Sequence, residues 1–512
     1  MNVKRTIAAS IAAVFMAGAV APAFAAEPVV KGPESVNDWY NAGQKFVADS
    51  KKVMPNARRA KNVILFVGDG MGVSTVTAAR ILEGQMNGKT GEENRLSFEN
   101  LPYVALSKTY SWDQQTSDSA PTMTAMVTGY KAREGMLSVN HSTPRGECDA
   151  AVIAANSLPT ILEQAAAAGK DTGVVSTARI THATPAATYA HTPVRDWEHN
   201  GQPPAGCGVK DIARQLIEVS PAVKTSLKVA LGGGREYFRN NTQFDPEYAA
   251  KKGLRTDGRD LTAEWVSTRG ANAKFVYGRT GFDAATPANT DYLLGLFERS
   301  HMQYEADRAV DTAGEPSLTE MTEKSINMLK KNPNGFFLHV EAGRIDHAHH
   351  AGNAKRALLD TIELSKAVKK AYEMTDPNDT LIVVTADHSH VFTIAGYPHR
   401  GNDILGLSKE VPSVDGNAPT NSLAGDGKPY TTLGYQNGPG AAGSLTAGVR
   451  TDLSSIDTKT LGYLQQAIVP MGSETHAGED VAIYSSGPKA YLMRGSMEQN
   501  WIYHVMKDAF GF

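Results

Sequence analysis

Residues 336–350 read FFLHVEAGRIDHAHH, and this stretch decides the fold. Its first part, residues 336–340, is a short apolar run of the kind that forms a buried strand. The run ends at Glu341, and residues 346–350 then supply one carboxylate and three imidazoles. Such groups are the usual ligands of catalytic zinc, and an α/β sheet presents its ligands at the carboxyl ends of the strands. The stretch therefore predicts a metal site at the edge of a sheet.

Two further apolar runs also end near an acid. Residues 62–67 (NVILFV) lead into Asp69, and residues 380–385 (TLIVVT) lead into Asp387. Helical patterns alternate with strands: we expect helices at 157–169, 318–331 and 354–372, and a strand at 172–176. This alternation predicts an α/β fold with a large, mainly parallel central sheet and helices on both faces.

The length, composition and net charge of the chain limit the classes of function that we expect. A chain of 512 residues can bury a large core, and 41% hydrophobic residues are typical of a globular protein. The formal net charge is −3 and no long basic run is present, so we expect no nucleic-acid binding beyond terminal phosphates. Small substrates are favoured.

Residues 1–25 have the order of a secretory signal: basic residues, then an apolar stretch, then small residues up to Ala25. We predict cleavage after Ala25, export to the periplasm or the exterior, and a mature domain at 26–512 without a membrane anchor. The two cysteines, Cys148 and Cys207, are expected to form a disulfide in such an oxidising compartment.

A hydroxyl-rich stretch at 116–125 (TSDSAPTMTA) precedes a helical pattern. Ser119 could be a nucleophile there, because the N-terminus of a helix favours an anion such as a phosphate under attack. Taken alone, this position favours a serine that only caps the helix, because hydroxyl residues are common before helices. No G-x-S-x-G motif surrounds it, so a metal would have to activate it.

Together these motifs resemble those of the alkaline phosphatases. The resemblance covers nearly all of the mature chain and rests on the stretches 68–72 (GDGMG), 118–120 (DSA), 184–187 (TPAA), 341–350, 385–390 (TADHSH) and 475–480 (THAGED). It implies hydrolysis of phosphate monoesters to an alcohol and inorganic phosphate at alkaline pH, through a phosphoserine on Ser119.

The resemblance also implies two zinc ions and one magnesium ion per subunit. The first zinc would be bound by Asp346, His350 and His476, the second by Asp69, Ser119, Asp387 and His388, and the magnesium by Asp69, Thr184 and Glu341. Two zinc ions can stabilise the attacking and leaving oxygens of a displacement, and an all-oxygen site suits magnesium.

Further residues match positions around this centre. Arg195 resembles the arginine that holds the phosphate, and Asp118 would orient it. His182 and His347 match positions beside the metal ligands of the family, where histidine at both is typical of the animal branch. From the sequence alone, Arg195 is indistinguishable from a surface residue in a polar loop.

Other features resemble the animal branch. Residues 396–450 are rich in Gly, Pro, Asn, Ser and Thr and resemble a crown-like inserted subdomain, in which Tyr397 would reach a partner subunit of a homodimer. Cys148 and Cys207 also match a disulfide pair of the animal branch. A calcium site is implied at Glu247, the carbonyl of Phe297, Glu298 and Glu315, where Glu315 replaces an aspartate.

Three other functions remain open. A sulfatase would need an arginine two residues after Pro121, and Met123 stands there. A phosphodiesterase could use the same metals, although Arg195 favours a monoester. A secreted phosphate- or zinc-binding protein could use the same ligands but would not need Ser119.

Overall fold

The computed structural model describes residues 35–446 and 449–512, so the predicted signal peptide at 1–25 lies outside the described part. A ten-stranded sheet forms its centre, in the order β17-β2-β16-β8-β1-β7-β3-β4-β6-β5. Within this sheet β16 is the strand that runs antiparallel to its neighbours. The prediction of a large, mainly parallel sheet is therefore confirmed. The strands are β1 (Asn62–Gly68), β2 (Tyr103–Lys108), β3 (Asp171–Arg179), β4 (Leu227–Gly233), β5 (Ala273–Val276), β6 (Tyr292–Leu296), β7 (Phe336–Ala342), β8 (Thr380–Ala386), β16 (Val481–Ser486) and β17 (Ser496–Glu498).

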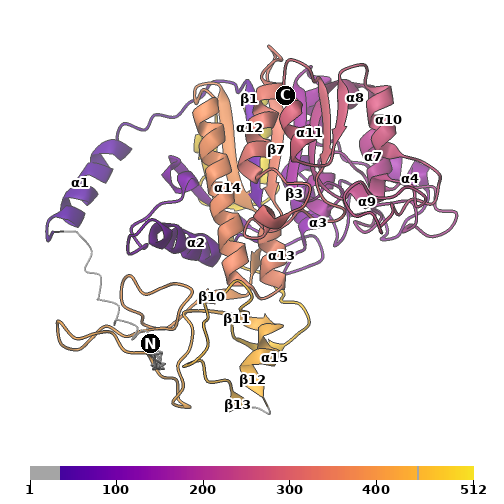
Figure 1. The fold of residues 1–512 in the computed structure, drawn as a ribbon. Helices are drawn as coiled ribbons and strands as arrows, with labels where there is room; N and C mark the ends of the chain where they lie inside the picture. The colour runs from indigo at the N-terminus through magenta and orange to yellow at the C-terminus, as the bar shows by residue number, and fades with distance from the viewer. Residues whose placement is uncertain (1–34, 447–448) are drawn as a thin grey trace, which may run out of the picture.

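Alternate side chains of β1 enter two separate cores, because successive residues of a strand point to opposite faces. Ile64 and Phe66 belong to one apolar cluster, and Val63, Leu65 and Val67 belong to the other. Helices cover both faces of the sheet (Figure 1). The first cluster includes residues of α2 (Val73–Met86), α12 (Leu318–Leu329) and α14 (Ala354–Met374), and the second includes residues of α3 (Ser119–Thr128), α5 (Ile161–Ala167), α7 (Ile212–Ile217) and α16 (Trp501–Phe510).

The predicted helices are present, with one shifted start. The helix expected at 157–169 begins at Ile161, because Thr160 is its N-cap: the Thr160 hydroxyl accepts from the Glu163 amide at 3.1 Å, and the Glu163 carboxylate accepts from the Thr160 amide at 2.9 Å. The remaining helices are α1 (Asp38–Ser50), α4 (Ala150–Asn156), α6 (Ala183–Ala186), α8 (Pro221–Ser226), α9 (Arg235–Phe238), α10 (Leu261–Thr268), α11 (Arg279–Ala284), α13 (Arg344–His350) and α15 (Gly440–Ser444).

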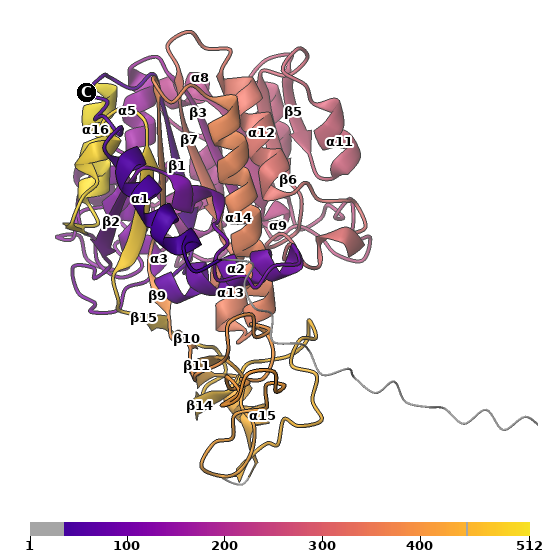
Figure 2. The ribbon, with the colours of Figure 1, turned by 90° about the vertical axis from the view of Figure 1, so that its left-hand side faces the viewer.

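A separate part of the chain lies below one edge of the large sheet, next to α13 (Figures 1 and 2). It contains a three-stranded sheet of β10 (Phe392–Ile394), β11 (Leu433–Gly438) and β14 (Ala467–Pro470), and the hairpin of β12 (Leu445–Thr446) and β13 (Val449–Arg450). We call residues 391–472 the insert. The segment predicted at 396–450 lies inside it, but β10 and β14 extend the insert beyond those bounds.

Two further structural findings bear on the sequence analysis. Cys148 and Cys207 are joined in a disulfide across a sequence separation of 59 residues. Among residues 35–446 and 449–512, none of the helices combines the length and the apolarity that crossing a membrane requires.

Candidate active site

Four neighbouring parallel strands deliver the predicted site residues to one edge of the sheet. Strands β8, β1, β7 and β3 are adjacent, so their carboxyl ends lie side by side. Asp69 follows β1, Glu341 lies near the end of β7, and Asp387 follows β8. Thr184 lies in α6, just after β3. Parallel pairing is the reason that residues hundreds of positions apart meet here.

Ser119 is the first residue of α3 and is almost fully buried. The residue that caps this helix is Asp118, whose side chain accepts from the Ala120 amide, so the interpretation of Ser119 as a mere cap is wrong. The Ser119 hydroxyl lies 3.4 Å from Asp69 Oδ1 and 3.2 Å from His388 Nε2. Ser119 therefore lies against two of the residues expected to bind the second zinc.

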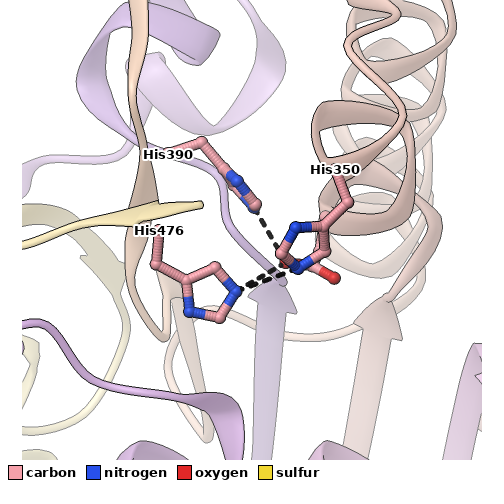
Figure 3. Close-up of side chains that lie close together, drawn as sticks. His350, His390 and His476 are labelled. Carbon is pink, nitrogen blue, oxygen red and sulfur yellow. Dashed lines mark hydrogen bonds and ion pairs between the residues drawn. The ribbon is translucent and has the colours of Figure 1, made fainter. Parts of the chain in front are cut away.

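A second group of potential ligands gathers beside Ser119. Asp346, His350 and His476 come together: Asp346 Oδ1 is 3.3 Å from the Nε2 atoms of both histidines. His390, which the sequence analysis did not single out, completes the group, with all ligand atoms within 4.8 Å of one another. Figure 3 shows His350, His390 and His476 converging from different segments of the chain. Carboxylate oxygen and imidazole nitrogen at such spacing suit zinc.

His390 and Glu474 support this group through hydrogen bonds to Asp346 and His350. His390 pairs with Asp346 at 2.8 Å and with Glu474 at 2.5 Å. Burial alone would lower the pKa of His390, but these two carboxylates raise it to about 9. The Glu474 carbonyl also lies 2.5 Å from His350 Nδ1, which leaves Nε2 of His350 facing the group. The sequence signal for His390 was its place two residues after His388.

Asp69, Glu341 and Asp387 lie beside these ligand groups, and no lysine or arginine of the described residues forms an ion pair with them. Burial and the neighbouring Asp387 and Asp346 raise the pKa of Asp69 well above its ordinary value. Burial, with Asp387 nearby, raises the pKa of Glu341 to about 8. One oxygen of Glu341 and one of Asp387 are buried without a hydrogen-bond partner in the part of the chain that the structure describes. Several buried acids this close together require bound cations to stay ionised.

The group expected to bind magnesium is also assembled. The Thr184 hydroxyl donates to Asp69 Oδ2 at 3.3 Å, and the Ser176 hydroxyl donates to Glu341. A nitrogen of His182 lies within 4.8 Å of the Asp69 and Glu341 oxygens. The sequence predicted a magnesium site made only of oxygen ligands, whereas the structure places the imidazole of His182 beside these oxygens.

Arg195 lies inside the site, although its sequence surroundings resemble a surface loop. Its guanidinium pairs with Asp118 and lies 3.0 Å from His182 Nε2. Burial would raise the pKa of Asp118, but Arg195 holds that pKa below its ordinary value. The loop is fixed by a bond from the Arg195 amide to the Gly135 carbonyl at 2.7 Å and by a small apolar cluster that includes Trp197. The two disulfide-bonded cysteines pack against the same cluster.

His347 and His182 meet a third histidine, His301, which the sequence analysis missed. Their ligand atoms lie within 4.8 Å of one another. Guanidinium groups surround the cluster: Arg344 lies 3.1 Å from His347 Nδ1, and Arg179 lies 2.5 Å from His301 Nε2. Burial and these positive neighbours lower the pKa of His347 to about 3, so the ring is neutral.

The residues expected to bind calcium are only partly assembled. Glu247 and Glu298 form a group with Asp311, which the sequence analysis did not name. Glu315 lies nearby, and its Oε2 accepts from the Gln303 amide at 2.9 Å. Burial raises the pKa of Glu315 to about 9. Asp311 is the third carboxylate of this group, and both of its buried oxygens lack a hydrogen-bond partner among the described residues, whereas Glu315 uses one oxygen to accept from Gln303.

The site opens into a hollow of about 580 Å³. Asp118, His350 and His476 line this hollow together with Gln114, Glu134 and Met471. A small substrate can therefore reach His350 and His476, two of the residues expected to bind the first zinc, from solvent.

Comparisons with known proteins agree with this geometry. The sequence profile of the alkaline phosphatase family matches residues 60–512. The tissue-nonspecific alkaline phosphatase of Gallus gallus is 46% identical over 489 residues, which cover 93% of this chain and 90% of that protein. The alkaline phosphatase of Gadus morhua is 44% identical over 486 residues, covering 93% and 97%. A crystal structure of Thermus thermophilus alkaline phosphatase aligns with a TM-score of 0.62 at 25% identity and covers 89% and 92%.

Proposed function

Because the chain belongs to the alkaline phosphatase family, whose expected function is hydrolysis of phosphate monoesters, we propose that Ser119 is the nucleophile of that reaction. The observation that carries the proposal is the contact of the Ser119 hydroxyl with both Asp69 and His388. A serine that served only as a helix residue would have no reason to lie against two metal-type ligands. In the first step the Ser119 oxygen would displace the alcohol from phosphorus to give a phosphoserine, and the serine proton would leave with the alcohol. A water molecule would then displace the Ser119 oxygen and release inorganic phosphate.

The donor atoms fit the metals that the family implies. Asp346, His350 and His476 would hold one zinc, with His390 behind Asp346. Asp69, Ser119, Asp387 and His388 would hold a second zinc, and Asp69, Thr184 and Glu341 would hold magnesium. When bound, the zinc ions lower the pKa of the serine hydroxyl and stabilise the leaving oxygen. The unpartnered oxygens of Asp387 and Glu341 support this assignment.

The protein's own groups orient the substrate. Arg195, fixed by Asp118, can donate two parallel hydrogen bonds to nonbridging phosphoryl oxygens. The N-terminus of α3 adds backbone amides and a favourable dipole beside Ser119. In the second step Ser119 becomes the leaving group, and the same contacts stabilise its oxygen. All of these contacts involve the phosphoryl group, so a broad range of small alcohols is expected as leaving groups.

The proposal is tested on the mature, metal-replete protein with an aryl phosphomonoester at alkaline pH. We expect turnover that is lost on chelation and restored only when zinc and magnesium are both returned. Ser119→Ala should lose at least a thousandfold in kcat while keeping an unchanged thermal unfolding midpoint. Ser117→Ala, a change of the neighbouring hydroxyl, is the matched control.

Two outcomes would contradict the proposal. Preferred turnover of a phosphodiester would favour a diesterase with the same metals. Full function of Ser119→Ala would favour a binding protein, because metal binding without turnover does not require a nucleophile.

We also propose a secreted homodimer. Residues 1–25 have the sequence of a secretory signal, and a disulfide is consistent with an oxidising compartment. Tyr397 in the insert is 91% exposed, and α1 exposes Trp39, Tyr40 and Phe46. Apolar surface of this kind is typical of an interface. Light scattering of the purified protein, together with its N-terminal sequence, tests both parts.

A calcium site is proposed at Glu247, Glu298 and Asp311, three carboxylates whose oxygens lie within 4.8 Å of one another. Oxygen-only ligands suit calcium, and both buried carboxylate oxygens of Asp311 lack a hydrogen-bond partner among the described residues.

A further inference from the structure

His349 lies between two proposed metal ligands in the sequence, but its ring nitrogens contact Thr75 and Tyr435 and not the other proposed ligands. It is fully buried in α13, the helix that carries Asp346 and His350. Its Nε2 lies 3.0 Å from the Thr75 hydroxyl of α2, and its Nδ1 lies 2.7 Å from the Tyr435 hydroxyl of β11. Both ring nitrogens are therefore engaged.

The two partners of His349 complement a neutral imidazole. Such a ring has one N–H donor and one acceptor, and a hydroxyl can serve as either. One hydroxyl therefore donates to His349 while the other accepts, so neither nitrogen is left unsatisfied. Loss of either hydroxyl would leave a buried nitrogen without its partner, which is costly.

Tyr435 makes this contact from the insert. It lies in the middle strand of the three-stranded sheet, paired with Phe392 and Ala467. Its ring is buried, and Phe392 packs against both Tyr435 and His349, with ring centroids 5.2 and 5.0 Å apart. The hydroxyl of Tyr435 thus joins a well-packed sheet of the insert to the helix that carries two metal ligands.

The helix α13 needs such support. It has only seven residues, and so short a helix has little stability of its own. The His349 ring also packs on His390, at 4.8 Å between centroids, and His390 in turn contacts Asp346. A shift of His349 would therefore move the proposed ligands of the first metal by two routes. One route is α13 itself, and the other is the contact through His390 to Asp346.

We propose that Tyr435 is a positioning residue for the first metal site: through His349 its hydroxyl fixes α13, so that Asp346 and His350 keep the spacing that holds the ion. The inference rests on the proposed function, since it presupposes a metal at Asp346, His350 and His476. It gives the insert a role in the catalytic centre although Tyr435 touches neither metal nor substrate.

The experiment compares Tyr435→Phe with the matched variant Tyr463→Phe. Tyr463 also lies in the insert, but its hydroxyl bonds to Thr431 within the insert itself. Each protein is loaded with zinc and magnesium, and the rate of zinc loss to a chelator is followed together with total metal content. We expect Tyr435→Phe to lose one of its zinc ions about tenfold faster than wild type, which is the low end of the effect of changing a residue that supports a metal ligand. Tyr463→Phe should lose zinc at the wild-type rate.

A second variant keeps the result interpretable. His349→Phe should also lose zinc faster, and the double variant His349→Phe, Tyr435→Phe should be no worse than His349→Phe alone, because both act through one bond. Excess zinc should restore kcat in each. Wild-type rates in Tyr435→Phe, or equal acceleration in Tyr463→Phe, would overturn the inference. If wild type itself binds no zinc or hydrolyses no monoester, the proposed function fails instead.

Discussion

Arg195 pairs with Asp118, the residue immediately before Ser119, and this pair joins the arginine's loop to the start of α3, the helix that carries the proposed nucleophile. Asp118 has two partners: it accepts from the Ala120 amide as the cap of α3 and it receives the guanidinium. One carboxylate thus fixes the direction of the helix and of the arginine. The two groups expected to contact the phosphoryl oxygens therefore share a common support.

The first prediction concerns the geometry of Arg195. Arg195→Lys should lower kcat/KM for an aryl phosphomonoester by about a hundredfold, because an ammonium cannot reproduce two parallel hydrogen bonds. The conservative change Arg214→Lys, on the exposed side of α7, should leave kcat/KM unchanged. Equal activity of Arg195→Lys and wild type would show that Arg195 does not hold the phosphoryl group.

The second prediction concerns the support of the first metal site. Glu474→Gln removes the charge that pairs with His390, so the hold of His390 on Asp346 weakens. We expect zinc affinity at this site to fall by about ten- to a hundredfold, with little change at the second site. Competition with a chromophoric chelator measures both affinities. Glu479→Gln, which changes a nearby carboxylate that pairs with Ser389, is the control.

The acids at the ends of the strands could be predicted from the sequence because the pattern that reveals them is local. An apolar run followed by an acid indicates a buried strand and its carboxyl end, so Asp69, Glu341 and Asp387 could be found directly. The sheet then brings them together by parallel pairing, which the alternation of strands and helices also predicts.

Arg195 and Asp311 could not be found in the same way. The role of Arg195 depends on tertiary contacts with Gly135 and with a satellite cluster that includes Trp197. Asp311 joins Glu247 and Glu298 only through the folding of an irregular loop. Without a periodic pattern, sequence spacing carries no information about such contacts, and the resemblance supplied Arg195 but pointed to Glu315 where the structure favours Asp311.

The third prediction separates these two carboxylates. Calcium at a hundred times its dissociation constant should stabilise the wild-type protein by about 2.7 kcal/mol, seen as a raised unfolding midpoint. Asp311→Asn should abolish this stabilisation, whereas Glu315→Gln should retain most of it. The reverse order would favour the ligand set predicted from the sequence.

The fourth prediction concerns the disulfide. Replacing Cys148 and Cys207 together by serine should reduce the free energy of unfolding by roughly 4 kcal/mol, because the closed loop spans 59 residues. The apolar cluster beneath the Arg195 loop would loosen as well, so KM should rise. Denaturant unfolding and steady-state kinetics measure the two effects. Mild reduction of the wild-type protein should reproduce them, and an unchanged KM would separate the disulfide from the Arg195 loop.

The last prediction is a pH dependence away from the metals. His191 pairs with Glu163 at 3.1 Å, next to the N-terminus of α5. Burial opposes ionisation of both groups, but the pairing raises the pKa of His191 and lowers that of Glu163. The stabilisation that His191 contributes is therefore complete below its unfolded pKa, about 6.5, and is lost as pH rises through its raised folded pKa. The stabilisation that Glu163 contributes is present above its unfolded pKa, about 4.3, and is lost as pH falls through its lowered folded pKa.

His191→Gln should accordingly destabilise the protein most between about pH 4.5 and 6.5, by roughly 1.5 kcal/mol, the lower end for a hydrogen bond to a charged group. The difference from wild type should shrink as pH rises further, because the wild-type histidine then loses its proton. Thermal unfolding at a series of pH values measures this difference, with the exposed His504→Gln as the control. A difference that grew toward alkaline pH would contradict the ion pair, since a neutral histidine cannot supply it.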